Sequence, residues 1–234
     1  WYLTSIKNSN DPFVNINPKQ PHITEDSDSF SIYNTTHFRL NILSPKGYEY
    51  WHNVEITGFF KINSILNSSN LEKEEDDAPT GITLRSRSGQ HNSNIPCEGT
   101  ALDGILLSNG ISQWKKEIWH TGGYTNPEGV KKIDISLLDK WIGWKVVVYN
   151  LEDRSVKMES YMDYEGNNTW EPVTSYIDNG SWYAKNSDEV FEKANCMKSK
   201  NHVLLDPKPI ITFRSDNLDL SFKNLSIREI IVNN

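Results

Sequence analysis

The chain has 234 residues, a net charge of −7 and a pI of about 5.4, with 36% hydrophobic and 24% charged residues. This composition is typical of a soluble globular protein with a core, and the length fits one large domain. No long basic block is present, which argues against nucleic-acid binding. No apolar run reaches about 20 residues, which argues against a membrane span.

The chain divides into short segments with the pattern of strands. Residues 1–29 are polar and rich in proline, so we expect an arm or edge strand that wraps the body. The expected strands cover residues 30–43, 51–62, 81–87, 102–107, 113–120, 131–137, 144–150, 155–163, 170–177, 209–215 and 218–232. Asn109-Gly110 favours a tight hairpin between two of them.

One short helix is expected at residues 186–194, where Asn186 and Glu189 are spaced as a capping box. Many strands, regular turns and no internal repeat predict an all-β fold, a two-sheet antiparallel sandwich forming a single domain over residues 1–234. The first and last long strands are expected to pair. The acidic run from Glu72 to Asp77 is typical of an exposed loop. A structural calcium ion there is an alternative, although the spacing matches no EF-hand.

The cysteines and sequons bear on the compartment. Cys97 and Cys196 are the only cysteines, and we predict a disulfide between them, with two buried thiols as the alternative. Glycosylation sequons begin at Asn34, Asn67, Asn167, Asn179 and Asn224. These features predict a secreted or cell-surface glycoprotein. The start at Trp1 rather than Met is expected of a mature form or of a trimmed chain, with any signal peptide already removed.

Residues 80–124 concentrate the side chains that can do chemistry. Arg85 and Arg87 stand two apart and are expected to share one face of a strand. Cationic, amide, imidazole, carboxylate and phenol groups are expected to converge on one patch: Arg85, Arg87, Gln90, His91, Lys115, Lys116, Glu117, His120 and Tyr124. Such a mixture suits an acidic, hydroxyl-rich ligand.

Four segments carry a resemblance to a known superfamily: Trp51-His-Asn-Val-Glu-Ile-Thr-Gly-Phe-Phe, Thr80-Gly-Ile-Thr-Leu-Arg, Trp144-Lys-Val-Val-Val-Tyr and Phe222-Lys-Asn-Leu-Ser-Ile-Arg-Glu-Ile. The pattern resembles the concanavalin A-like (jelly-roll) superfamily. Its members include laminarinase-type glycosidases, alginate-lyase-type polysaccharide lyases and carbohydrate-binding modules. The resemblance implies a jelly-roll sandwich and identifies a fold better than an activity.

The match to the enzymes of this superfamily is incomplete. The laminarinase-type signature Glu-x-Asp-x-x-Glu is absent. Arg85-Ser-Arg87, the pair Gln90-His91, and Tyr124 or Tyr149 are similar to the Arg, Gln-x-His and Tyr strands of alginate-lyase-type enzymes. Gln90 and His91 are adjacent, however, where that family has one residue between them.

The resemblance and the residue types favour a polysaccharide lyase-like depolymerase of an acidic glycan. A lyase acting on a uronic acid must neutralise the substrate carboxylate, remove the C5 proton and protonate the leaving oxygen. The catalytic candidates are His91, His120, Tyr124, Arg87 and Gln90. The substrate-binding candidates are Arg85, Lys116, Glu117, Glu159 and Tyr161. No metal or cofactor is required by this hypothesis.

Three alternatives stay open. A glycoside hydrolase would draw a carboxylate pair from Glu117, Glu159 and Asp163. A lectin-like module of a cell-surface protein would bind polysaccharide without cutting it. A zinc site from His91, His120 and Glu117 is conceivable, although no HExxH or paired-Cys motif supports it.

Overall fold

The computed structural model describes residues 1–3, 11–45, 50–66 and 80–232. It consists of two seven-stranded antiparallel sheets, which confirms the predicted all-β sandwich. The first, here called the site sheet, has the order β1 (Val14–Asn17), β4 (His37–Leu43), β13 (Ile210–Asp216), β6 (Gly81–Ser88), β7 (Ala101–Leu107), β8 (Ile111–Glu117) and β9 (Glu128–Lys132). The second sheet has the order β12 (Glu171–Asp178), β11 (Val156–Asp163), β10 (Ile142–Asn150), β5 (Val54–Ile65), β14 (Leu218–Glu229), β3 (Phe30–Tyr33) and β2 (His22–Glu25).

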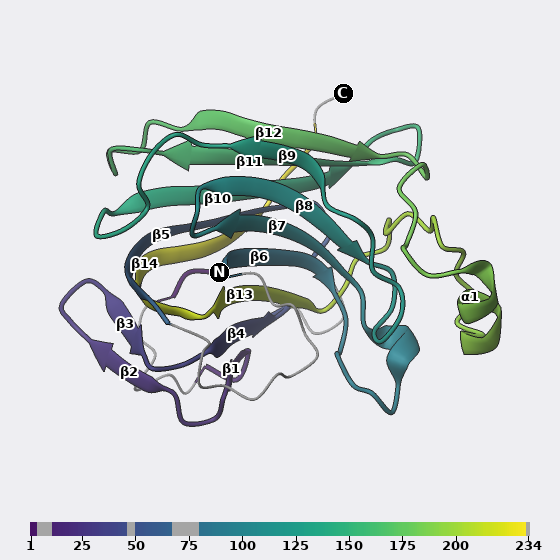
Figure 1. Ribbon diagram of the computed structural model, residues 1–234, viewed down its shortest axis with the longest axis horizontal. Coiled ribbons are helices and arrows are strands. Elements are labelled where there is room, and N and C mark those ends of the chain that lie inside the picture. Colours follow the sequence, from purple (N-terminus) through teal and green to yellow (C-terminus); the bar gives the residue numbers. More distant parts are fainter. Residues whose placement is uncertain (4–10, 46–49, 67–79, 233–234) are drawn as a thin grey trace.

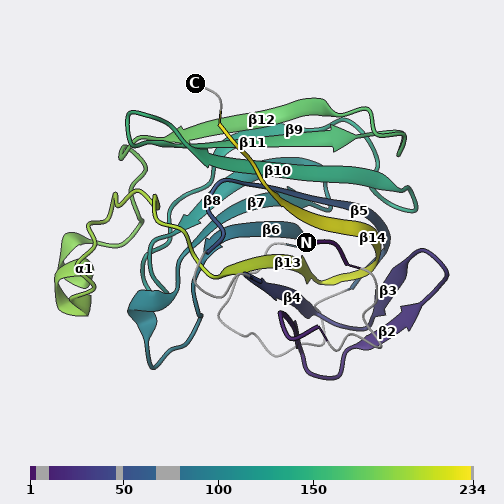
Figure 2. The ribbon, with the colours of Figure 1, turned by 180° about the vertical axis from the view of Figure 1, so that it is seen from behind.

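The strand pairs follow the apolar alternation of the sequence. The long strands β5 and β14 pair in the middle of the second sheet, as expected for the first and last long strands (Figure 1). Seen from behind, β14 again lies beside β5 (Figure 2). β7 and β8 pair across Asn109-Gly110, where Gly110 has a φ of 82°, so the hairpin is confirmed.

Two expected strands are wrong in their bounds. Residues 30–43 form two strands, β3 and β4, which lie in different sheets. The chain changes sheet at Asn34, which has a left-handed φ of 50° that asparagine tolerates. Residues 131–137 contain only the end of β9, which starts at Glu128. The N-terminal segment supplies β1 and β2, one at an edge of each sheet.

The core lies between the two sheets, where Trp114, Trp144 and Met158 are completely buried. A Cβ atom added at Gly104 on β7 would lie 2.5 Å from Val146 of the facing sheet and 3.0 Å from the Trp114 ring. A glycine is therefore required at this position, where the facing sheet leaves no room for a side chain. Among the described residues, no helix is long and apolar enough to cross a membrane.

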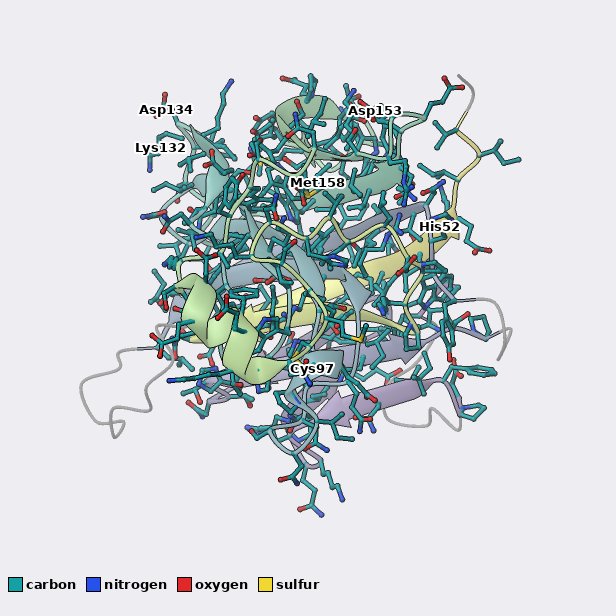
Figure 3. The ribbon with its side chains drawn as sticks, turned by 90° about the vertical axis from the view of Figure 1, so that its right-hand side faces the viewer. His52, Cys97, Lys132, Asp134, Asp153 and Met158 are labelled. Carbon is teal, nitrogen blue, oxygen red and sulfur yellow. A yellow bond between two sulfur atoms is a disulfide. The ribbon has the colours of Figure 1, made fainter. Side chains whose placement is uncertain are left out.

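Helix α1 (Asp188–Ala194) stands apart from both sheets (Figure 1). Its N-cap is Ser187, and the expected capping box from Asn186 is wrong, because the Asn186 side chain donates to the carbonyl of Gly122 instead. The predicted disulfide between Cys97 and Cys196 is confirmed, and it joins the segment after helix α1 to the connection between β6 and β7. Figure 3 shows Cys97 close to the helix.

Some expectations fall outside the described residues: the acidic run from Glu72 to Asp77, with its calcium alternative, and the sequon at Asn67. The other sequon asparagines, Asn34, Asn167, Asn179 and Asn224, are exposed, so glycosylation there stays a prediction.

Candidate functional site

The outward face of the site sheet carries a row of polar side chains that runs across six strands. Strand register places them opposite one another in the order Asn15, Asn41, Thr212, Arg85, Asp103 and Lys115. Alternate residues of each strand point to this face, while their neighbours enter the core. All six line a pocket of about 1050 Å³. The pocket is thus a consequence of strand pairing between segments remote in sequence.

Glu117, the last residue of β8, is the centre of the pocket. The chain turns back after it, and Tyr124 forms an isolated β-bridge with Glu117. Three groups lie within hydrogen-bonding distance of its carboxylate: the Tyr124 hydroxyl at 2.8 Å, His120 Nδ1 at 3.1 Å and His91 Nε2 at 2.7 Å. Arg85 Nη2 donates to the same carboxylate. One buried carboxylate therefore gathers a phenol, two imidazoles and a guanidinium.

The electrostatics of this cluster keep Glu117 ionised, although its side chain is only 1% exposed. Burial acts to raise the pKa of Glu117, but the hydrogen bonds from His120 and His91 and the charge of Arg85 hold it well below its usual range. Burial acts to lower the pKa of Arg85, and the carboxylates of Asp103 and Glu117 outweigh it and raise this pKa. Arg85 Nε also donates to Asp103 at 2.7 Å.

Most of the predicted site residues meet in this pocket. Its lining includes Arg85, Gln90, His91, Lys115, Glu117, His120 and Tyr124. His91 follows β6 in a loop, and its Nδ1 lies 3.1 Å from the Gly89 carbonyl oxygen. The His91 and His120 rings stand edge to face with centroids 5.3 Å apart. The predicted convergence of the two imidazoles with a phenol and a carboxylate is therefore present, and its catalytic use stays a prediction.

Arg87 does not share the face of Arg85, so that expectation is wrong. The pairing of β6 with β13 shifts register between Ile210 and Thr212, and Arg87 itself has a left-handed φ of 50°. This irregularity turns its side chain away from the pocket. Arg87 Nη2 donates to Asn150 at 2.9 Å, and Nη1 donates to the carbonyl of Leu205. Burial lowers the pKa of Arg87 to about 10.

Lys116 is also misplaced by the prediction, because it alternates with Lys115 and Glu117 and points inward. Its side chain is fully buried, and Nζ donates to Asp178 at 2.7 Å and to the carbonyl of His202 at 3.0 Å. Burial lowers the pKa of Lys116, and Asp178 opposes that shift. Lys116 is therefore buried between the sheets and does not line the pocket.

Replacing Lys116 by methionine is expected to lower the free energy of unfolding by about 3–5 kcal/mol, because the buried carboxylate of Asp178 loses its counterion. The double variant Lys116→Met/Asp178→Leu should recover most of the loss. Lys193→Met, which removes an exposed pair with Glu189, should leave the free energy of unfolding nearly unchanged. Guanidinium titration measures all three, and equal stability of Lys116→Met and Lys193→Met would contradict the expectation.

Glu159 and Tyr161 lie on β11 of the second sheet, so the structure does not bring them together with the other predicted site residues. The hydroxyls of Tyr149 and Tyr161 each donate to Glu159 at 3.3 Å. Asp163, at the end of β11, accepts backbone N–H groups of the following loop, from Gly166 at 2.8 Å and others. The carboxylate pair that a glycoside hydrolase would draw from Glu117, Glu159 and Asp163 is not assembled.

Sequence reasoning missed several residues of the pocket. Asp103, Arg39 and Arg214 line it, and so do the amides Asn15, Asn17 and Asn41. Asp103 has a recognisable signal, because it is the only charged residue in an otherwise apolar strand, where it must have a partner. Arg39 and Arg214 have no local signal, since they become neighbours only when β4 pairs with β13.

Three groups in the pocket have the chemistry of metal ligands. Within the described part of the chain, ligand atoms of His91, Glu117 and His120 all lie within 4.8 Å of one another. Imidazole nitrogens and a carboxylate oxygen suit divalent transition metals.

No family model matches the chain, and no curated protein sequence matches it significantly. Its fold is nevertheless similar to solved structures. The metal-free carbohydrate recognition domain of Emp46p has a TM-score of 0.52 at 8% identity, over 94% of this chain and 89% of that chain.

Two lyases are also similar in fold. The endo-β-1,4-glucuronan lyase of the fungus Trichoderma reesei has a TM-score of 0.47 at 8% identity, over 98% of this chain and 95% of that chain. The PL-14 alginate lyase of Aplysia kurodai has a TM-score of 0.34 at 12% identity, over 93% and 92%. At 8% identity the likeness to the Emp46p domain is one of fold alone, and it agrees with the jelly-roll sandwich that the sequence resemblance implies.

Proposed function

We propose that this protein is a polysaccharide lyase-like depolymerase of an acidic glycan. The observation that carries the proposal is the pairing of Tyr124 and His120 on one ionised carboxylate in an open pocket. The Tyr124 hydroxyl lies 3.4 Å from His120 Nδ1, and both groups contact Glu117. Two proton-transfer groups held side by side are what an elimination needs.

The reaction is a β-elimination across C4 and C5 of a uronic acid. His120 directs Nδ1 to Glu117, which leaves Nε2 as the basic nitrogen that takes the C5 proton. The electrons of the C5–H bond form the C4=C5 double bond as the C4–O bond breaks. The Tyr124 hydroxyl then gives its proton to the leaving oxygen. Glu117 is a positioning residue, because it orients both groups and does not reach the substrate itself.

The charge of the pocket lining supports an acidic ligand. The chain carries a net charge of −7, yet five cationic and three acidic side chains line the pocket. Lys115 and Lys185 form no ion pair with any described residue, and Lys115 Nζ lies 5.0 Å from the centroid of the Tyr124 ring. Lys115 thus lies beside the proposed proton donor, where it can neutralise the substrate carboxylate.

The amides of the pocket favour a second candidate, a lectin-like module that binds the glycan without cutting it. Asn15, Asn17, Asn41 and Asn186 line the pocket, and amides both donate to and accept from sugar hydroxyls. Both candidates place the protein outside the cell or at its surface. The Cys97–Cys196 disulfide supports that location, because disulfides persist in oxidising compartments.

A screen of acidic and neutral polysaccharides, read for both chain length and retention, tests the proposal. A lyase should shorten an acidic glycan and release unsaturated uronic-acid ends that absorb in the near ultraviolet. His120→Ala should remove this absorbance, whereas the matched variant His22→Ala, on the exposed edge strand β2, should keep it. Retention of the glycan without shortening would support the lectin-like module in place of the lyase. If the protein neither shortened nor retained any glycan, both candidates would be wrong.

A further inference from the structure

The pocket contains a donor set whose composition goes beyond what an elimination requires. His91 Nε2, His120 Nδ1 and the Glu117 carboxylate come from a loop, a turn and a strand end, and lie within 4.8 Å of one another. We propose that these three side chains bind a divalent transition-metal ion of the zinc type, with a fourth position open to the pocket. Such an ion accepts two imidazoles, one carboxylate and one exchangeable ligand.

The distances between the donor atoms are near those that this ion requires and would have to lengthen by a few tenths of an ångström. A tetrahedral ion with bonds of about 2.0–2.1 Å holds its ligand atoms roughly 3.4 Å apart. His91 Nε2 and His120 Nδ1 lie 2.7 and 3.1 Å from the two carboxylate oxygens of Glu117. Small rotations of the two imidazole rings, each 26% exposed, would admit the ion between them.

The groups around the donors orient them toward one another. His91 directs Nδ1 to the carbonyl of Gly89 at 3.1 Å, so that Nε2 faces the cluster. A backbone carbonyl on the second ring nitrogen is the usual partner of a metal-binding histidine. Glu117 is likewise held by Arg85.

The net charge of the cluster is compatible with a bound cation. Arg85 is paired with two carboxylates, Asp103 and Glu117, so these three buried groups together carry one negative charge. When both imidazoles are neutral, a divalent ion would balance this charge. Tyr124, whose hydroxyl lies 2.8 Å from Glu117, borders the open position.

The inference has a consequence that rests on the proposed function. A bound ion would occupy His120 and screen Tyr124, so zinc should inhibit the elimination. Metal binding itself does not depend on lyase activity, so the two ideas can fail separately.

Equilibrium dialysis of chelator-treated protein against Zn²⁺, followed by metal analysis, tests the site, with Co²⁺ absorption in the visible range as a second probe. We expect one ion per chain, and a Kd raised about tenfold or more in His91→Ala and in His120→Ala. The control His22→Ala should bind as the unaltered protein does. His91 is partly exposed, so its variant is expected to fold, which a thermal melt verifies.

Two results would overturn the inference: no binding at Zn²⁺ concentrations on the order of 1 mM, or undiminished binding in both histidine variants. Zinc binding without any glycan cleavage would uphold the metal site and reject the lyase. Cleavage without zinc binding would uphold the lyase and reject the metal site.

Discussion

Replacing both Cys97 and Cys196 by serine is expected to lower the free energy of unfolding by about 4–5 kcal/mol. The disulfide joins residues 99 apart in sequence, and a cross-link that closes a loop of about 100 residues removes that much chain entropy from the unfolded state. Guanidinium unfolding of the oxidised protein and of the double variant measures the difference.

Loss of the disulfide should also disturb the pocket, because Cys97 lies in sequence between His91 and His120, which line it. The backbone N–H of His120 donates to the carbonyl of Pro96 at 2.8 Å, and Lys198 Nζ donates to the carbonyls of Cys97 and Ile118. The unaltered protein treated with reductant is the matched control and should reproduce the double variant. A decrease of less than about 1 kcal/mol in the free energy of unfolding would show that packing alone holds helix α1 and its flanking segments in place.

Replacing Tyr124 by phenylalanine is expected to lower kcat on an acidic glycan by about 10²–10⁴-fold, because the leaving oxygen loses its proton donor. The substitution keeps the ring beside Lys115 and removes only the hydroxyl that donates to Glu117. KM should change little, since the ring and the cations of the pocket remain. Initial rates of near-ultraviolet absorbance over a range of substrate concentrations separate kcat from KM.

Tyr161→Phe is the matched control, because it removes a hydroxyl that donates to a glutamate on the other sheet. Its kcat should equal that of the unaltered protein. If Tyr124→Phe also retained full activity, the proton donor would have to be another group, and the proposed roles would be wrong. If only glycan retention fell, Tyr124 would be a binding residue of a lectin-like module.

Much of the fold could be predicted because alternation is local. Val54, Ile56, Phe60 and Ile62 of β5 are buried as the period-two pattern of their own sequence predicts, and the β7–β8 hairpin follows from Asn109-Gly110. The failures came where a local irregularity changes the direction of the side chains. Arg87 lies within the register shift between β6 and β13, and residues 30–43 change sheet at Asn34.

The site was predictable only in the part that comes from one stretch of chain. Gln90, His91, Glu117, His120 and Tyr124 could be named together because they lie close in sequence. The same reasoning wrongly included Lys116, since the choice between two adjacent lysines depends on which face of β8 enters the core. It also added Glu159 and Tyr161, which carry suitable chemistry but belong to the other sheet.

The sequence by itself determined the strand pattern, the cysteine pair and the residue types near the chain's midpoint, because these depend on neighbours along the chain. Only the tertiary structure decided that Glu117 would be buried against Arg85 and joined by both imidazoles. The tertiary structure alone also placed Arg39 of β4 and Arg214 of β13 beside the central strands of the site sheet. The physical reason is that pairing between distant strands sets the register, and register decides which side chains share a face.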